Sequence, residues 1–285
     1  MTVAETAPLP SPAAVMGQAR RENFPVASLL LPRRARAHLL AVYGFARLVD
    51  DVGDEVTGDR LALLDQIEAD LDRLWDGGRP REALIARLAP AVAEHSLPSQ
   101  PFKKLIEANR RDQVVHRYAT FEELESYCQL SANPVGELVL LIFGAATPER
   151  MVLSDKVCTA LQLAEHWQDV AEDYAAGRIY LPAEDLARFG LSESDLAAAS
   201  APPGLRALMA FEVRRARELI DAGAPLAATL RGRAAFAVQA FVAGGRSALH
   251  AIERADYDVL GSTPRAGRAE RARQLTLALL RGRRR

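Results

Sequence analysis

Apolar side chains recur every three or four residues along most of the chain. This spacing brings them onto one face of an α-helix, which can then pack against a core. One such series is Leu61, Leu64, Ile67, Leu71 and Leu74. Another runs from Leu39 to Val49, directly before a cluster of acidic residues at 50–55. The pattern predicts an amphipathic helix over each of these stretches.

The same periodicity predicts further helices over 80–94, 100–117, 121–146, 150–175, 204–221 and 231–256. Glycine and proline separate several of them, as at 77–80 and 201–204, because both residues interrupt helices. No segment alternates between apolar and polar residues as a half-buried strand does. We therefore expect an all-α fold in a single domain.

The two ends of the chain differ from this helical part. Residues 1–16 are rich in Pro and Ala and lack the basic start and apolar run of a secretory signal, so they predict a disordered leader. The helical domain then covers 17–262, and a basic segment covers 263–285. Eight arginines in this last segment favour attraction to an anionic membrane surface, and a solvated basic tail explains them equally well.

Composition narrows the class of protein. Hydrophobic residues make up 49% of the 285 residues, which is enough to bury a core and excludes a fully disordered chain. Lys and Arg number 36 against 37 Asp and Glu, and the net charge of −1 argues against a nucleic-acid partner. Two cysteines cannot form a disulfide framework, and the longest apolar run, 138–146, is too short to span a bilayer. These features predict a cytoplasmic protein, with contact at the inner face of the membrane left open.

An acidic cluster ends the helix that runs through Leu39 to Val49. Steps of four, three and four residues place on one helical stripe the side chains of Tyr43, Arg47, Asp50 and Asp54. Like charges four residues apart destabilise a helix by roughly a few tenths of a kcal/mol. The pair of aspartates therefore favours a cation between them.

A second stripe lies in the helix predicted over 150–175. Its members, again at steps of three and four, are Gln162, Glu165, Asp169 and Asp173. Gly177 is a helix stop and Pro182 prevents early resumption, which brings Arg178 to the end of the stripe.

Carboxylates without Cys or paired His suit Mg²⁺, which prefers one or two carboxylates together with substrate phosphates. Two stripes facing each other across a helical cavity would hold several Mg²⁺ ions and stabilise a diphosphate as a leaving group. Arg47 and Arg178 would add hydrogen bonds to its phosphates. Either stripe alone is equally well explained as a solvated helix face, but both together favour the diphosphate site.

These residues resemble the squalene/phytoene synthase family. DDVGDE at 50–55 is similar to its first aspartate-rich motif, and QDVAEDYAAGRIYLP at 168–182 to its second. Residues 117–128, RYATFEELESYC, resemble its central region. ENFPVASLLLP at 22–32 and SANPVG at 131–136 further resemble the hydroxysqualene synthase branch, often labelled HpnC.

The resemblance implies an all-α isoprenoid synthase fold, a helical bundle around a central cavity, with its catalytic domain over 17–262. It implies Mg²⁺ as the cofactor, held by Asp50, Asp54, Asp169 and Asp173, with the Asp50 and Asp169 carboxylates central to catalysis. It places near the diphosphate the side chains of Tyr43, Arg47 and Gln162. Tyr127 would assist proton or cation handling, although a core tyrosine with a bonded hydroxyl explains it as well.

Four positions depart from the family pattern or stay open. Glu165 stands where the family usually has Asn; a carboxylate still ligates Mg²⁺, but the negative charge rises. Gln168 stands where Arg is common, and Arg246 lies near the place of a diphosphate-contacting Tyr, which it is a candidate to replace. Asn133, which precedes Pro134, would meet substrate at the cavity wall, and a simple helix break explains the pair equally well.

By this resemblance the chain converts presqualene diphosphate to hydroxysqualene and diphosphate, in the biosynthesis of squalene and hopanoids. No GxGxxG run occurs, which agrees with capture by water rather than reduction by a nicotinamide. The alternative is head-to-head condensation of two prenyl diphosphates, giving phytoene or presqualene diphosphate. A di-iron protein needs Glu-x-x-His pairs, which the sequence lacks. A helical scaffold without catalytic activity stays open as another function. Binding to other proteins of the same pathway also stays open.

Overall fold

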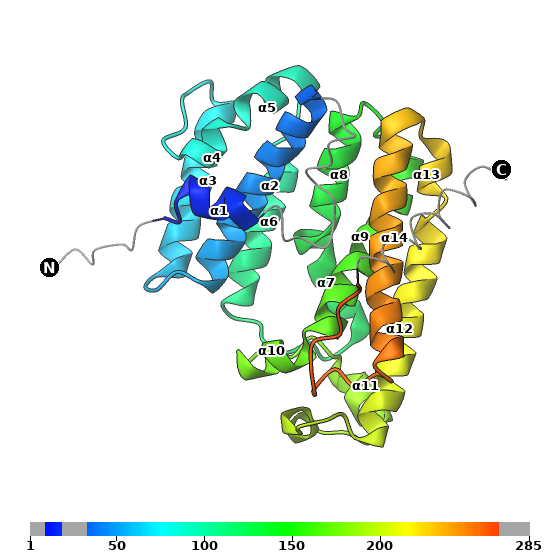
Figure 1. Ribbon diagram of the computed structural model, residues 1–285. Helices are drawn as coiled ribbons and strands as arrows, with labels where there is room; N and C mark the ends of the chain where they lie inside the picture. Colours follow the sequence, from blue (N-terminus) through cyan, green and yellow to red (C-terminus); the bar gives the residue numbers. More distant parts are fainter. Residues whose placement is uncertain (1–8, 19–32, 268–285) are drawn as a thin grey trace, which may run out of the picture. The chain divides into compact units, whose positions relative to one another are not determined.

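A computed structural model describes residues 9–18 and 33–267 (Figure 1). The predicted branch motif at 22–32, the first residues of the leader, and 268–285 of the basic segment lie outside these ranges. The described residues form helices and no strand. The predicted all-α fold is confirmed.

By their contacts, the described helices group into two compact units. The first unit contains residues up to 114 together with 134–146. Its helices are α1 (Pro12–Gln18), α2 (Arg33–Asp54), α3 (Arg60–Trp75), α4 (Ala83–Ala86), α5 (Ala89–His95), α6 (Gln100–Asp112) and α8 (Asn133–Ile142). Buried apolar faces of α2, α3 and α6 form its core.

The second unit contains 115–133 and the chain from Thr147 onward. Its helices are α7 (Phe121–Ser131), α9 (Pro148–Gln168), α10 (Val170–Ala175), α11 (Ala183–Arg188), the 3₁₀ helix η1 (Glu193–Ala197), α12 (Pro203–Gly223), α13 (Leu226–Thr229) and α14 (Gly232–Arg254). The long helices α9, α12 and α14 pack together. Gly223 allows close contact because a Cβ there would lie 2.7 Å from the Leu153 carbonyl oxygen on α9.

The beginning of the chain is helical where a disordered leader was predicted. Residues 12–16 form the start of α1, with Pro12 at its first position, where the missing N–H costs no helical hydrogen bond. Val15 is fully buried, and α1 packs on α2. The prediction of disorder from the Pro/Ala content was therefore wrong for residues 12–16. Burial of one apolar face of α1 outweighs the weak preference of this composition for disorder.

Two predicted helices are each divided in two near a proline. The stretch predicted over 121–146 stops at Ser131 and resumes at Asn133, because Pro134 has no N–H to donate. The stretch over 80–94 becomes α4 and α5, with Pro90 in the first turn of the second helix. Gly177 has a φ of +82° and ends the acidic segment as predicted.

A short backbone pairing fixes the segment after Gly177 against the chain before α7. The Ile179 N–H donates to the His116 carbonyl at 2.9 Å, and the Ala183 N–H to the Tyr118 carbonyl at 2.9 Å. Arg117 adds a hydrogen bond to the Gly177 carbonyl at 2.6 Å. This pairing holds Arg178 and Tyr180 in a defined position within the second unit.

A buried acidic network ties α12 to α11. Arg215 lies 3.0 Å from Glu212 Oε1 and 2.8 Å from Asp185 Oδ2. Burial raises the pKa of Glu212 to about 8; Arg215 opposes this rise and Asp185 adds to it. Folded protein therefore keeps a proton on Glu212 at pH 7, which the unfolded chain, with an ordinary carboxyl pKa, has released.

We expect Glu212→Gln to change how stability depends on pH. Because the folded-state pKa is raised, the proton on Glu212 stabilises the fold at acidic pH, and this contribution is lost as pH rises from about 5 to about 8. Denaturant unfolding at several pH values should show wild type losing stability relative to Glu212→Gln over that range. Glu218→Gln, exposed on the same helix, should follow wild type. Parallel curves for wild type and Glu212→Gln would contradict the assignment.

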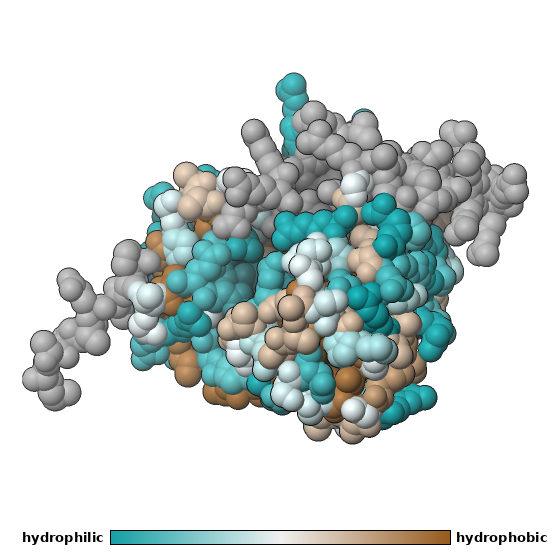
Figure 2. Space-filling model, turned by 60° about the horizontal axis from the view of Figure 1, so that its bottom comes forward, coloured by the Kyte–Doolittle hydropathy of each residue, from teal (hydrophilic) through white to brown (hydrophobic). Residues whose placement is uncertain are grey.

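Few large apolar side chains are exposed among the residues that the structure describes. In the described ranges these are Leu61, Val114, Val135 and Val152. The face shown in Figure 2 mixes hydrophilic residues with weakly and strongly hydrophobic ones. Among the described helices, none combines the length and the apolar character needed to span a bilayer.

Candidate active site

The first acidic cluster lies at the end of α2, and α6 supports it. Asn109 Nδ2 on α6 donates to Asp50 Oδ1 at 3.0 Å and to the Leu105 carbonyl at 3.2 Å. Gly53 makes this contact possible, because a Cβ there would collide with the Asn109 side chain. Gln113 Nε2 donates to the Gly53 carbonyl at 3.0 Å. The carboxylate of Asp50 is thus held by a buried amide that the sequence did not single out.

Asp50 is an exposed residue, yet the protein around its carboxylate displaces much of the bulk water. This desolvation raises the pKa of Asp50 to about 6, against the lowering effects of the Asn109 hydrogen bond and of Arg47. Repulsion from Asp54 adds to the rise. Asp50 is therefore largely ionised at neutral pH and loses its charge below about pH 6 in the metal-free protein.

Arg47 forms ion pairs within α2 and the turn that follows. Its Nε lies 2.6 Å from Asp51 Oδ1, and its Nη2 3.1 Å from Glu55 Oε1. Asp51 is buried; burial raises its pKa and Arg47 lowers it. In this structure Arg47 neutralises a buried carboxylate. Its predicted contact with diphosphate, like that of the half-buried Tyr43, stays a prediction.

The second acidic cluster spans a bend in the helix. α9 ends at Gln168 and α10 begins at Val170, so Asp169 sits between them, whereas a continuous helix was predicted. Hydrogen bonds of helical spacing persist: the Asp169 N–H donates to the Glu165 carbonyl at 3.0 Å, and the Asp173 N–H to the Asp169 carbonyl at 2.8 Å. The predicted stripe of Glu165, Asp169 and Asp173 therefore survives the bend.

A pocket of the second unit adjoins this stripe. It is lined by His166, Val170, Asp173, Arg178, Ile179, Tyr180, Leu181 and Leu196. Asp173 and Arg178, both predicted site residues, meet here, and the Arg178 N–H donates to the Asp173 carbonyl at 2.8 Å. The pocket thus combines an acid and a cation with an apolar wall.

His166 stacks on Tyr180 in this wall, with ring centroids 3.7 Å apart. Tyr127 lies 5.9 Å from Tyr180 and 6.3 Å from His166, which makes it part of an aromatic group. Gln162 Nε2 lies 3.2 Å from His166 Nε2, so Gln162 contacts this histidine. The predicted contact of Gln162 with diphosphate stays a prediction. Burial lowers the pKa of His166 to about 3, and the charge of Arg178 adds to that effect. The imidazole therefore stays neutral.

Other singled-out residues have simpler surroundings. Asn133 Oδ1 accepts a hydrogen bond from Thr159 on α9 at 3.1 Å. Arg246 Nε lies 3.1 Å from Asp221 on α12, and Gly245 packs closely on Leu161 and Ile220. Arg246 thus balances a carboxylate of α12, and its replacement of the relatives' tyrosine stays a prediction.

One compact group of potential metal ligands occurs in the described ranges, and it contains no residue of either stripe. It consists of His38, Glu94 and His95. Its members already bind one another, with His38 Nδ1 3.0 Å from His95 Nε2, and Arg34 lies 2.6 Å from Glu94. The predicted aspartates form no such group within one unit. Whether the two stripes face one cavity concerns two separate units and stays a prediction.

The chain matches the squalene/phytoene synthase family over residues 18–276. The chain belongs to this family. The family match runs beyond the predicted domain end at 262 and includes the start of the basic segment. The hydroxysqualene synthase of Rhodopseudomonas palustris is 38% identical over 217 residues, which cover 74% of this chain and 72% of that protein.

Two more comparisons support membership. The 15-cis-phytoene synthase of Synechococcus elongatus is 32% identical over 84% of this chain and 82% of its own. The crystal structure of the squalene synthase HpnC from Alicyclobacillus acidocaldarius is 45% identical, with a TM-score of 0.78 over 86% of this chain and 95% of that chain. The protein is an enzyme of the squalene/phytoene synthase family with its helical isoprenoid synthase fold.

Proposed function

We propose that this enzyme converts presqualene diphosphate and water into hydroxysqualene and inorganic diphosphate, with Mg²⁺ as its cofactor. The observation that carries this proposal is the pocket of the second unit. Arg178 and Asp173 give it a polar side suited to diphosphate and its metal, and His166 and Tyr180 give it an aromatic side. Similarity to hydroxysqualene synthases supports the choice of substrate.

The predicted ligands fit Mg²⁺ by their chemistry. Asp50, Asp54, Glu165, Asp169 and Asp173 offer only carboxylate oxygens, which are hard ligands. Asp50 is exposed, and its hydrogen bond with Asn109 uses Oδ1, which leaves Oδ2 for a metal. When bound, Mg²⁺ would supply positive charge that stabilises the departing diphosphate.

The protein residues then have distinct tasks. The bond between substrate carbon and diphosphate oxygen breaks, with the electron pair leaving on oxygen, and Arg178 donates hydrogen bonds to the phosphate. The carbon cation that remains is stabilised by the electron-rich faces of Tyr127 and Tyr180. The neutral His166 adds no competing positive charge. Water forms the new carbon–oxygen bond and releases its proton to solvent.

Similarity to phytoene synthases favours a second candidate, the head-to-head condensation of two prenyl diphosphates. The two functions differ in their substrates. Purified enzyme with Mg²⁺ should release diphosphate from presqualene diphosphate, with or without reduced nicotinamide, and form no presqualene diphosphate or phytoene from farnesyl or geranylgeranyl diphosphate. Condensation without turnover of presqualene diphosphate would establish the second candidate instead.

We expect Glu165→Asn to raise the Mg²⁺ concentration needed for half-maximal turnover. Glu165 lies one helical turn before Asp169, so its carboxylate adds negative charge to the stripe. Turnover at saturating Mg²⁺ should stay within about tenfold of wild type, or about 1.4 kcal/mol of barrier. A Mg²⁺ titration of both proteins measures this directly. An unchanged requirement would leave the second cluster with Asp169 and Asp173 alone.

A further inference from the structure

After α14 the chain returns to the second acidic cluster. We call residues 259–266 the C-terminal strap; Figure 1 shows it in orange to red, running back alongside α9 and α10. Thr263 Oγ1 donates to Glu172 Oε1 at 2.6 Å, and Gln168 Nε2 donates to the Pro264 carbonyl. Gln168 and Pro264 are both buried. The strap is therefore attached to the residues on either side of Asp169.

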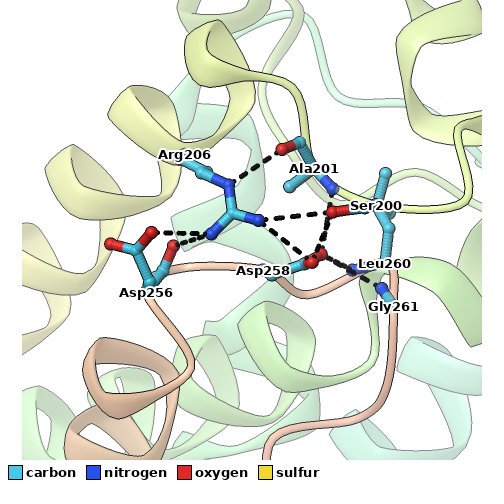
Figure 3. Close-up of polar contacts among 7 residues, drawn as sticks. All are labelled: Ser200, Ala201, Arg206, Asp256, Asp258, Leu260 and Gly261. Carbon is cyan, nitrogen blue, oxygen red and sulfur yellow. Dashed lines mark hydrogen bonds and ion pairs between the residues drawn. The ribbon is translucent and has the colours of Figure 1, made fainter.

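A dense polar network fixes the base of the strap (Figure 3). Arg206 of α12 donates to Asp256 Oδ2 at 2.9 Å and to Asp258 Oδ2 at 3.1 Å. Asp258 also accepts from Ser200 Oγ at 2.6 Å. Asp256 and Tyr257 have φ values of +51° and +58°, which side chains disfavour, and the network holds this turn in place. The network therefore fixes the direction in which the strap leaves this turn.

The strap places Arg265 at the second cluster. Arg265 follows Pro264 directly, and the Pro264 carbonyl is bound by Gln168, the residue before Asp169, so the backbone of Arg265 lies beside the second cluster. Arg265 is exposed, so its donors can reach a ligand in solution. Four carboxylates crowd this stretch, at 165, 169, 172 and 173. An anionic diphosphate approaching them needs cations besides Arg178.

We propose that Arg265 is a diphosphate-binding residue, and that Gln168 and Thr263 position it through the strap. This inference rests on the proposed function, since it assigns a second arginine to the leaving group. A guanidinium offers a planar pair of N–H donors that matches phosphate oxygens, so Arg265 can bind two oxygens of the diphosphate at once. The start of the basic segment thereby acts in the chemistry, whereas the sequence suggested a role only at the membrane.

The test measures binding of inorganic diphosphate in the presence of Mg²⁺ by calorimetry, with the full-length protein. Arg265→Gln should weaken the Kd at least about tenfold, and Arg265→Lys should recover part of the loss because the charge remains. Arg79→Gln removes the same charge from an exposed non-helical position and should bind as wild type does. Equal affinity of Arg265→Gln and wild type would overturn the inference while leaving the proposed function intact.

Thr263 supplies the test of positioning. Thr263→Val should weaken diphosphate binding, whereas Thr263→Ser, which keeps the hydroxyl that binds Glu172, should bind as wild type does. The valine and serine variants should have the same thermal stability. If valine and serine variants bind alike, the strap does not position Arg265. Absence of Mg²⁺-dependent diphosphate binding by wild type would instead contradict the proposed function itself.

Discussion

Asp50→Asn and Asp169→Asn should each lower turnover of presqualene diphosphate at least about a hundredfold. Each substitution removes one ligand charge from a different cluster, and a hundredfold loss corresponds to about 2.7 kcal/mol of barrier. The fold should survive, because the Asp50 side chain is exposed, Asp169 sits at a bend between helices, and helix propensity barely differs between Asp and Asn. Steady-state rates at saturating Mg²⁺ measure the loss of turnover, and thermal unfolding shows whether the fold is kept.

A matched control separates the loss of a metal-ligand charge from the loss of any surface carboxylate charge. Asp76→Asn removes the same charge from an exposed position that ends α3 and should leave turnover unchanged. If either cluster variant retained near wild-type rates at saturating Mg²⁺, the metal assignment of that cluster would be wrong.

Gly53→Ala should destabilise the protein by about 1–3 kcal/mol, the usual cost of overpacking. The added methyl group would lie 3.0 Å from Asn109 Cγ and closer still to its Oδ1, so the buried amide must turn away. It would then lose its hydrogen bond to Asp50, and turnover should fall together with stability. Denaturant unfolding and steady-state kinetics on the same preparation measure the two effects.

A double-mutant cycle shows whether the effect comes from this contact. In Asn109→Ala the colliding oxygen is absent, so adding Gly53→Ala should cost much less than it does in wild type. Gly17→Ala, in α1 with no neighbour within 4 Å of the new Cβ, controls for the change from glycine itself and should not destabilise. Additive losses in the cycle would show that Gly53 is needed for some other reason.

Local periodicity was enough to predict the helices and both acidic stripes. Asp50 and Asp54 lie at the end of α2, and Asp173 and Arg178 share a pocket as their spacing around Gly177 indicated. Those features depend on residues a few positions apart, where helix geometry alone decides which side chains are neighbours.

Contacts between distant segments could not be predicted in this way. Asn109 reaches Asp50 across 59 residues, and Thr263 reaches Glu172 across 91. His166 follows the predicted Glu165, but only the tertiary position of Tyr180 shows that it lines the pocket. Helix spacing alone allows Arg47 to pair with Asp51 one turn later, but only tertiary packing shows that this aspartate is buried.

The central claim is that diphosphate leaves by cleavage of the carbon–oxygen bond and that water captures the resulting cation. Turnover of presqualene diphosphate in water enriched with ¹⁸O, followed by mass spectrometry of both products, tests it most directly. The account predicts one ¹⁸O in the hydroxyl group of hydroxysqualene and none in the released diphosphate. Label in the diphosphate and an unlabelled alcohol would mean that water attacks phosphorus, and would contradict the account.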